Sequence, residues 1–508
     1  MKNFAKDNLT LGIIGAGVMG RGIAQIAAIS GVQVIIFDIE QSACKSAVDF
    51  IERMLDRAVE KGKLTKNEAE LSKENISTID DINKLSSCDV IVEAIIEKLD
   101  IKQSLFRDLE AIVSPDCIIT TNTSSLSVTS IAAGCNNSER VAGLHFFNPV
   151  PLMKLVEVIR GLRTNNEVIK KLCELSERFG HNPVVVSDSP GFLVNHIGRG
   201  LVTEGLRIIY ENVTDPQTVD SVIRDCMDFR MGPFELMDLT GLDVTFPATE
   251  QIYQQYFHEP RLRPTPFQQR RFSAGLYGRK VGEGFYLYKN NEKVTSDEPP
   301  STISEGKLSF WVTSNCEPEL RKIIIDLLNE VDCLIDTADK PGADSIAIVL
   351  PLGWDVSTAS HMEELNAVQT IGIDSLLNLN KRIVLMTNPT TTSKVIDETR
   401  AIFLKTGRSV SVIKDSAGFI SQRMIATIVN IACELAQQGI AKPQDIDKGA
   451  KLGLGYPEGP LEMGNEIGAG KILTILENIF ACYGDMRYRP SPWLKRRAKL
   501  NLSLLHTD

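Results

Sequence analysis

His145 and Glu157 are the two residues of this sequence whose types and surroundings best suit proton transfer. His145 lies in the apolar run VAGLHF, residues 141–146, and Glu157 lies in the apolar run LVEV, residues 155–158. A neutral imidazole can take a proton near neutral pH, provided that a carboxylate fixes its tautomer. An acid inside an apolar strand needs a partner, because burying an unpaired charge is costly. We therefore expect a histidine base held by Glu157. A hydrogen-bonded core histidine is the competing interpretation.

A glycine-rich turn, GAGVMG at residues 15–20, could bind a phosphate. An apolar run at 11–14 precedes it, and a helix-like segment at 23–29 and a second apolar run at 32–37 follow it. In such a strand-turn-helix-strand unit, Gly15 makes the tight turn, Gly17 admits a pyrophosphate and Gly20 allows close helix packing. The N-terminus of the following helix would direct its free N–H groups at the anion, and Val18 and Met19 in the turn join the glycines as candidate cofactor contacts.

Asp38 follows the second apolar run, eighteen residues after Gly20. An acid at this place accepts hydrogen bonds from a ribose 2′-hydroxyl and repels a 2′-phosphate. The next two residues, Ile39 and Glu40, are not basic, so the pattern predicts NAD rather than NADP as the cofactor. The alternative is a glycine-rich turn without a ligand, which the flanking strands and the acid make less favourable.

The elements that must position these residues alternate between strand and helix. Strand-like runs at 90–92, 118–121, 141–146 and 184–186, with a helix at 101–112, predict a parallel sheet covered on both faces. Ligands bind at the carboxyl ends of such strands. Three polar clusters stand there: Glu93 with Glu97, NTSS at 122–125, and HFFNP at 145–149.

Two further segments depart from this alternation. Residues 41–73 have helical spacing of apolar residues and predict a helical hairpin bending near 61–63, with Arg57 and Lys61 on one face. Two such cations are by themselves typical of a solvated surface. After SPGFLVN at 189–195 the strands cease, and 201–211, 217–224 and 242–256 predict helices, with 231–238 as a turn and 289–304 as a linker.

The totals set limits on the chain. Its 508 residues suggest three or four domains, and 55 basic against 65 acidic residues give a net charge of −10, which disfavours nucleic acid as a partner. No apolar run is long enough for a membrane span, and the first residues have no signal-peptide pattern. Ten scattered cysteines without a CxxC pair predict reduced thiols in the cytoplasm and no metal site.

Several motifs resemble those of the NAD-dependent L-3-hydroxyacyl-CoA dehydrogenases. They are GAGVMG, VEAIIEKLDIK, TNTSSLS, GLHFFNPVPLMKLVEVI, SPGFLVN and GRKVGEGFY, in the family's order over residues 11–288. The resemblance implies NAD on the Rossmann domain and an acyl-CoA substrate in a cleft against the helical domain. It implies catalytic roles for His145, Glu157, Ser124 and Asn195, cofactor contacts by Glu97, Lys102, Ser124, Asn148 and Lys280, and CoA phosphate binding by Arg57 and Lys61.

The second half of the chain repeats part of the first. KDSAGF at 414–419 echoes SDSPGF at 187–192 with a shift of 227, and EGPLE at 458–462 echoes MGPFE at 231–235 with the same shift. Between the copies, 333–335, 345–350 and 382–386 predict strands of a reduced α/β unit. That unit has no GxGxxG, its LMTNP at 385–389 has no histidine, and Gln422 replaces Asn195. We therefore expect one active site, in the first half.

These patterns predict an α/β Rossmann domain (1–188), an all-α helical domain (189–290), a reduced Rossmann-like α/β unit (305–412) and a second copy of the helical domain (413–508). The two helical copies should pack within the chain as a pseudo-dimer, through 201–209 and 428–435, with further homo-oligomerisation left open. The doubled layout is similar to long bacterial forms that act on 3-hydroxyadipyl-CoA in phenylacetate degradation, and to 3-hydroxybutyryl-CoA dehydrogenases with a doubled C-terminal domain.

The predicted reaction is the reversible NAD-dependent oxidation of an (S)-3-hydroxyacyl-CoA. Two other functions stay open at this point. One is a non-catalytic nucleotide-binding protein that keeps the fold. The other is a dehydrogenase of a free hydroxy acid or sugar acid that uses no CoA.

Overall fold

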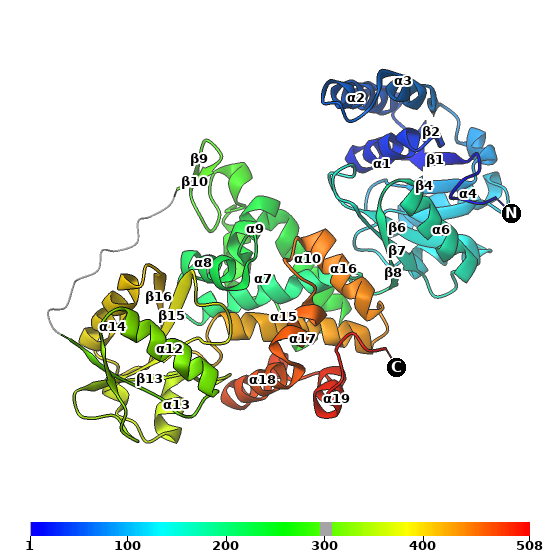
Figure 1. Cartoon of the computed structure of the whole chain (residues 1–508). Coiled ribbons are helices and arrows are strands. Elements are labelled where there is room, and N and C mark those ends of the chain that lie inside the picture. The colour runs from blue at the N-terminus through cyan, green and yellow to red at the C-terminus, as the bar shows by residue number, and fades with distance from the viewer. Residues whose placement is uncertain (1, 295–306, 508) are drawn as a thin grey trace. The chain divides into compact units, whose positions relative to one another are not determined.

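The computed structural model describes residues 2–294 and 307–507 (Figure 1). The chain divides into two compact units. The first consists of Met1–His196 with Gln438–Leu454, and the second of Ile197–Gln437 with Gly455–Asp508. Each unit contains one sheet of at least six strands.

The first unit is built on an eight-stranded sheet of order β3-β2-β1-β4-β5-β6-β7-β8. The strands are β1 (Thr10–Ile14), β2 (Gln33–Phe37), β3 (Ile76–Ile79), β4 (Val90–Glu93), β5 (Ile118–Thr121), β6 (Val141–Phe146), β7 (Leu155–Arg160) and β8 (Asn182–Ser187). The strands predicted at 90–92, 118–121, 141–146 and 184–186 are present.

The alternation of strands and helices predicted a parallel sheet, and this prediction was wrong for one pair of strands. β6 pairs antiparallel with β7, whereas β7 and β8 are parallel, so the last two strands run opposite to the others. The physical reason is the connection: residues 147–154 form a short loop without a helix, and only antiparallel neighbours can be joined by so short a link. This reversal places β7 directly beside the end of β6.

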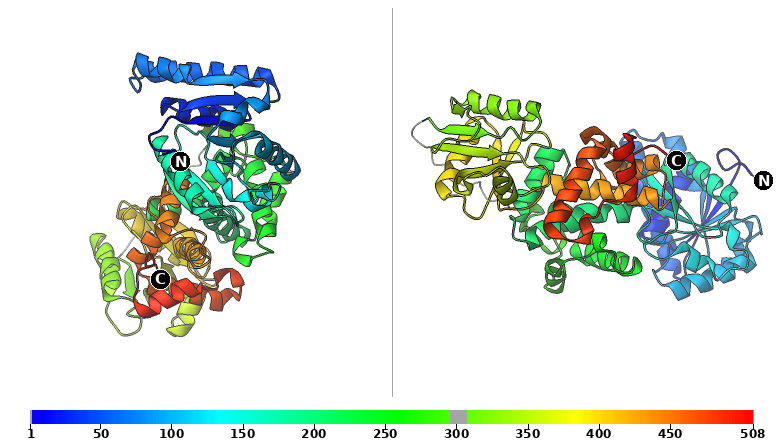
Figure 2. Two further views of the ribbon diagram at one scale, coloured as in Figure 1. Left: turned by 90° about the vertical axis from the view of Figure 1, so that its right-hand side faces the viewer. Right: turned by 90° about the horizontal axis from the view of Figure 1, so that it is seen from below.

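Helices cover both faces of this sheet (Figure 2). They are α1 (Val18–Ile29), α2 (Gln41–Glu60), α3 (Lys66–Glu74), α4 (Leu99–Ile112), α5 (Val128–Ala132) and α6 (Asn166–Arg178). α1 and α6 contribute to one apolar cluster and α4 and α5 to another, and β4, β5 and β6 are buried at every position. The predicted helical hairpin is confirmed as α2 and α3, with Gly62 between them at a φ of 66°.

One helix of the second repeat belongs to the first unit. α16 (Pro443–Leu454) packs against β7 and β8. The Ser187 amide donates to the Ile440 carbonyl at 2.7 Å, and the Lys448 ammonium donates to the Pro183 carbonyl at 3.1 Å. These contacts cover the edge strand β8, which would otherwise present unpaired backbone groups to solvent.

The second unit contains most of α7 (Val194–Tyr210) with α8 (Pro216–Met227), α9 (Pro233–Thr240), α10 (Leu242–Gln255) and α11 (Pro266–Ser273). The prediction of a turn at 231–238 was wrong, because Pro233 begins a helix there. Gly232 is its N-cap and donates its N–H to the Glu235 carboxylate, and proline is well suited to the first helical position. β9 (Tyr288–Lys289) and β10 (Glu292–Lys293) form a hairpin at the start of the predicted linker, whose remainder lies outside the described residues.

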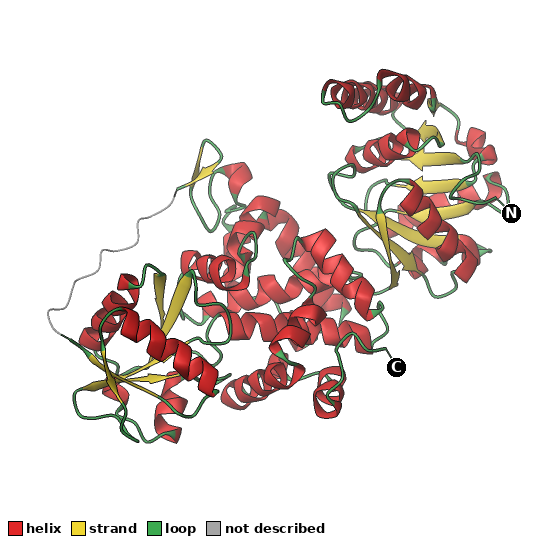
Figure 3. Cartoon of the chain, viewed as in Figure 1, coloured by secondary structure: helices red, strands yellow, loops and turns green. Residues whose placement is uncertain are grey.

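A six-stranded sheet follows, of order β12-β11-β13-β14-β15-β16, in which only β14 and β15 pair antiparallel (Figure 3). Its strands are β11 (Ser309–Val312), β12 (Leu334–Asp336), β13 (Ser345–Val349), β14 (Thr370–Ile373), β15 (Arg382–Thr387) and β16 (Ser409–Ile413). Its helices are α12 (Pro318–Glu330), α13 (Val356–Met362) and α14 (Ser393–Lys405). The reduced α/β unit is therefore confirmed, with three more strands than the sequence indicated.

The second helical copy consists, in this unit, of α15 (Ser421–Gln437), α17 (Pro460–Ile467), α18 (Ala469–Tyr483) and α19 (Pro492–Leu500). It contacts the first copy through the helices predicted to face each other. A Cβ added at Gly200 on α7 would lie 3.4 Å from the Ile428 backbone and 3.3 Å from the Ile431 side chain on α15. The missing side chain thus lets the two helices approach closely.

A buried polar network lies beside this contact. The Arg423 Nε donates to Glu204 at 2.8 Å, and the Tyr488 hydroxyl donates to the same carboxylate at 2.8 Å. Arg487 donates to the Thr203 hydroxyl at 3.0 Å. Each bond joins one helical copy to the other, so the network fixes their register as well as their contact.

Candidate active site

The antiparallel register of β6 and β7 sets His145 directly opposite Glu157. The His145 Nδ1 and the Glu157 Oε2 are 2.6 Å apart, and both side chains are buried. The predicted pairing is therefore present. Because a carboxylate accepts and does not donate, Nδ1 carries the proton and Nε2 keeps a free lone pair.

The second oxygen of Glu157 is also held. Its Oε1 accepts the backbone N–H groups of Leu193 at 3.0 Å and of Val194 at 2.9 Å, where α7 begins. The rings of Phe147 and Phe192 lie 4.5 and 5.8 Å from the imidazole, centroid to centroid. Hydrogen bonds on both oxygens fix the orientation of the carboxylate, so the imidazole can rotate little.

The glycine-rich turn has the geometry of a phosphate cradle. Gly15 has a φ of 101°, and a Cβ there would lie 2.5 Å from the Ala94 carbonyl. A Cβ at Gly20 would lie 1.8 Å from the Gly15 carbonyl, whereas a Cβ at Gly17 would meet nothing within 4 Å. Gly15 and Gly20 are thus needed for packing, and Gly17 leaves open space. α1 begins at Val18 and Met19 with no acid in its first turn, so its N-terminus suits an anion.

Asp38 lies beside this turn. One carboxylate oxygen accepts the Ala16 amide at 2.8 Å, and the other accepts the Glu40 amide at 3.0 Å. The side chain at Ile39 is 90% exposed and adds no charge. A ribose bound next to the cradle would therefore meet a fixed carboxylate, as predicted for NAD.

Glu97 organises the loop that follows β5. Its Oε1 accepts the Thr123 hydroxyl at 2.6 Å, the Ser124 amide at 3.0 Å and the Ser125 hydroxyl at 2.9 Å. Burial alone would raise the pKa of Glu97, but the hydrogen bond from Thr123 and the charge of Lys102 outweigh it and lower that pKa. The Ser124 backbone is thereby fixed while Ser124 itself stays exposed.

Lys102 lies behind this loop. Its side chain is buried, and its ammonium is 2.5 Å from Glu93 and 3.3 Å from Glu97. Glu93 also accepts the Thr121 hydroxyl at 2.7 Å. The sequence pointed to Lys102 as a cofactor contact, but its observed contacts brace the loop from within.

A basic cavity of about 590 Å³ lies between α1, α2 and the loop after β6. Both predicted cations, Arg57 and Lys61, line it, and so does Asn148. Arg21 and Lys63, which no sequence pattern indicated, also line it, and none of the described lining residues is acidic. The position of Arg21 in the first turn of α1, facing the helical hairpin, was the available signal. Four cations without a carboxylate favour a polyanionic ligand.

The two remaining predicted residues lie elsewhere. Asn195 follows Val194 in the first turn of α7 and is partly buried. Lys280 belongs to the second unit, where it forms an ion pair with Asp243.

Comparison with known proteins identifies the fold. Residues 10–189 match the NAD binding domain of 3-hydroxyacyl-CoA dehydrogenase, and residues 191–288 and 418–503 both match that family's C-terminal domain. The chain is 37% identical to the 3-hydroxyadipyl-CoA dehydrogenase of Escherichia coli, over 97% of this chain and 98% of the relative. It belongs to the 3-hydroxyacyl-CoA dehydrogenase family. As a 3-hydroxyacyl-CoA dehydrogenase it binds NAD, and its C-terminal domain occurs twice.

Other relatives of this dehydrogenase differ in length. A crystal structure of a 3-hydroxybutyryl-CoA dehydrogenase from Escherichia coli has a TM-score of 0.86 and 34% identity, covering 97% of this chain and 99% of the other. A probable 3-hydroxybutyryl-CoA dehydrogenase of Deinococcus radiodurans is 40% identical but covers only 55% of this chain, with 100% of its own length. The doubled layout therefore occurs in some members of the family and not in others.

The second sheet of the dehydrogenase shows what replaces the histidine pair. LMTNP, at the end of β15, is not the counterpart of HFFNP, because β15 pairs antiparallel with β14 and so takes the place of β7. The Asp374 amide donates to the Val384 carbonyl at 3.1 Å, so Asp374 and Val384 lie opposite each other on the antiparallel strands β14 and β15. They occupy the positions that His145 and Glu157 have on the antiparallel strands β6 and β7. Gln422, at the place of Asn195, donates to Asp374 at 3.0 Å. This buried cluster has no histidine and cannot act as the first one does.

Proposed function

We propose that His145 is the base of the reaction and takes the proton of the C3 hydroxyl of an (S)-3-hydroxyacyl-CoA through Nε2. NAD, bound over the cradle at Gly15–Gly20, would supply the acceptor for the hydride from C3. In the reverse direction the same nitrogen returns the proton. The observation that carries this proposal is the buried 2.6 Å contact of Nδ1 with Glu157, which places the proton of a neutral imidazole on Nδ1 and directs its lone pair to Nε2.

Glu157 has a positioning role in this proposal. Its three hydrogen bonds, to His145 and to the amides of Leu193 and Val194, hold the imidazole in one tautomer. Its negative charge stabilises the imidazolium that forms when the proton arrives, as an aspartate does in a hydrolytic triad.

Ser124 and Asn195 supply hydrogen bonds to the substrate oxygen, which gains negative charge during reduction of the ketone. Asp38 binds the ribose, and Asn148 and Lys280 contribute further cofactor contacts. Glu97 and Lys102 act mainly by fixing the loop that carries Ser124. Arg57 and Lys61, joined by the two other cations of their cavity, bind the phosphates of CoA.

For the substrate we propose 3-hydroxyadipyl-CoA. Support comes from the full-length relative of that name, which has the same doubled layout. The alternative is 3-hydroxybutyryl-CoA, the substrate for which the enzyme of the similar full-length crystal structure is named. The two substrates differ in length and in the terminal carboxylate.

The test measures kcat/KM for 3-hydroxyadipyl-CoA, 3-hydroxyhexanoyl-CoA and 3-hydroxybutyryl-CoA. The hexanoyl ester has the same chain length as the adipyl ester but no terminal carboxylate, so it is the matched control. A hydrogen bond to a charged group is worth about 1.5–3 kcal/mol, so the adipyl ester should be preferred by roughly tenfold or more. A higher value for either of the other esters would overturn this choice. Turnover of the free acids at a comparable rate would instead favour a dehydrogenase that uses no CoA.

We also propose that the second helical copy replaces a partner subunit. The two copies are tied by Gly200 against α15 and by Arg423 on Glu204, within one chain. A tethered copy has a high effective concentration, so no second chain is needed to cover this face.

The ten free cysteines suit a reducing compartment, which we take to be the cytoplasm. No helix in the described ranges is long and apolar enough to cross a bilayer.

A further inference from the structure

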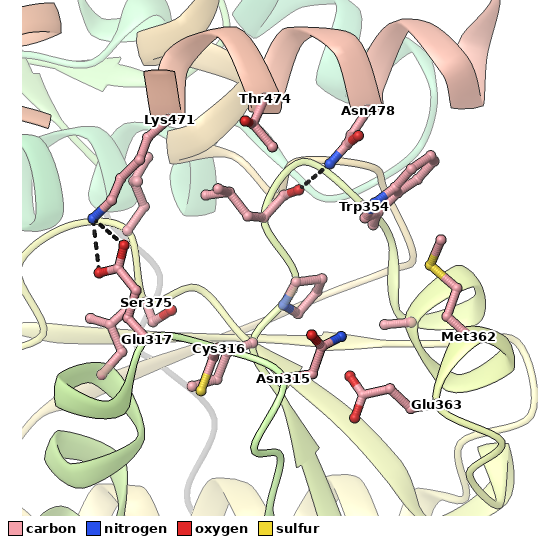
Figure 4. Close-up of a pocket in the computed structure, with 16 residues that line it drawn as sticks. Asn315, Cys316, Glu317, Trp354, Met362, Glu363, Ser375, Lys471, Thr474 and Asn478 are labelled. Atoms are coloured by element: carbon pink, nitrogen blue, oxygen red, sulfur yellow. Dashed lines mark hydrogen bonds and ion pairs between the residues drawn. The ribbon is translucent and has the colours of Figure 1, made fainter. Parts of the chain in front are cut away.

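The second unit contains a cavity of about 340 Å³ at the carboxyl ends of β11, β13 and β14 (Figure 4). The loops after these three strands form one side of it, and Lys471, Thr474 and Asn478 of α18 form the other. In open α/β sheets this edge is where ligands bind. The reduced sheet has therefore kept a cavity at the edge where a Rossmann domain holds its ligand.

This cavity does not suit a nucleotide. β11 and α12 correspond to β1 and α1. In the first sheet β1 lies beside β2, the strand after α1, and in the second sheet β11 lies beside β12, the strand after α12. Glu317 is the N-cap of α12, Pro318 follows without an N–H group, and Glu319 adds an acid in the first turn. The first helix of the chain offers Gly17 and no acid at the same place. Glu319 would repel a phosphate at this helix end, and Pro318 offers it no N–H group.

The charges of the lining residues point to a cation instead. The Lys471 ammonium is 2.8 and 2.9 Å from the two oxygens of Glu317, so that pair neutralises itself. Glu363 accepts the Thr313 hydroxyl at 2.6 Å, and within the described part of the chain no cation forms an ion pair with its carboxylate. The Lys340 ammonium donates to the backbone carbonyl of Glu363 and not to its carboxylate. Among the described residues, the Glu363 carboxylate is thus a lining acid without an ion-pair partner.

The remaining walls are mostly apolar. Leu352, Trp354, Met362 and Leu376 line the cavity, and the Asn315 carboxamide is drawn beside Glu363 on the side away from α18. An indole ring attracts a cation as well as an apolar group. A ligand with an apolar body and a single positive end would match both the walls and the carboxylate.

We propose that this cavity is a second binding site, specific for a small organic ammonium ion, a primary amine on an aromatic or aliphatic body. The ammonium group lies on Glu363 and Asn315, and the body packs on Trp354 and the neighbouring leucines. The site has no catalytic role in this proposal. The nearby acid Asp374 already accepts hydrogen bonds from Ser421 and Gln422, so it is not available as a base.

Three isosteric probes test the proposal on the full-length protein: benzylamine, benzyl alcohol and benzoate at pH 7. Binding is followed by ligand-observed NMR and by quenching of tryptophan fluorescence, since Trp354 lines the cavity. Benzylamine should bind in roughly the millimolar range expected of so small a ligand, benzyl alcohol more weakly, and benzoate not measurably. Binding of benzoate as tight as that of benzylamine would overturn the proposal.

The variant Glu363→Gln tests whether the charge of Glu363 binds the amine. Glutamine keeps the volume and can still accept from Thr313, so the fold should persist while the charge is lost. The affinity for benzylamine should fall about tenfold or more, because a charge-assisted bond becomes a neutral one. Glu364→Gln, at the exposed neighbour outside the cavity, is the matched control and should bind as the wild type does. Equal affinity of the Glu363→Gln variant and the control would refute the site.

Discussion

Replacing His145 with glutamine is expected to lower kcat by about 10²- to 10⁴-fold, the usual worth of a positioned base. Glutamine can still contact Glu157, but it cannot take a proton at the position of Nε2. The cradle at Gly15–Gly20 is built from other residues, so the Kd for NAD should stay within about twofold of the wild-type value. Stopped-flow NADH formation and isothermal titration calorimetry with NAD measure the two quantities.

Two companion variants complete that experiment. Glu157→Gln should keep the thermal melting curve close to that of the wild type and still lower kcat, because the neutral amide no longer stabilises the imidazolium. His361→Gln, at an exposed histidine of the second unit, should leave kcat unchanged. A His145→Gln protein with near wild-type turnover would remove the basis for the proposed mechanism.

Replacing Arg423 with methionine should destabilise the protein by about 3–5 kcal/mol, the usual cost of breaking a buried ion pair by removing one partner. The Arg423 side chain is fully buried, and it binds Glu204, Glu211 and Tyr488 at 2.8 Å each. Without it, Glu204 would be left as a buried charge without its nearest cation. Urea unfolding followed by circular dichroism gives the change in free energy.

The double variant Arg423→Met with Glu204→Gln separates charge from packing. If the penalty comes from the stranded carboxylate, the second change should recover a large part of the lost stability. Lys381→Met, which removes an exposed ion pair with Asp228 in the same unit, should have little effect. An Arg423→Met protein as stable as this control would show that the network does not hold the helical copies together.

Residue types and spacing were enough to predict the glycine cradle, Asp38 and the partnership of His145 with Glu157, because those chemical requirements are local. The 2.6 Å contact itself depends on the reversal of β7, which the expectation of a parallel sheet did not contain. Lys102 shows a similar limit. The family resemblance implied a cofactor contact for Lys102, and no sequence pattern indicated that folding buries its side chain against Glu93 and Glu97.

The second half was predicted less completely. The shift of 227 residues revealed the repeat, but a shift alone did not show that α16 joins the first unit or that Asp374 takes the place of His145. The position of Asp374 depends on strand register, which a one-residue slip would change entirely. No sequence pattern indicated Glu363 or its cavity, because an acid in a helical turn is ordinarily solvated.

The stoichiometry of NADH binding tests most directly the claim that the chain carries one catalytic centre, in its first unit. The cradle at Gly17 is open to a phosphate, whereas the corresponding helix of the second unit begins at Glu317 and Pro318. Isothermal titration calorimetry of the full-length protein should give one NADH per chain. Two NADH per chain would contradict the account, since the second sheet would then have to bind the dinucleotide that its carboxylates are expected to repel.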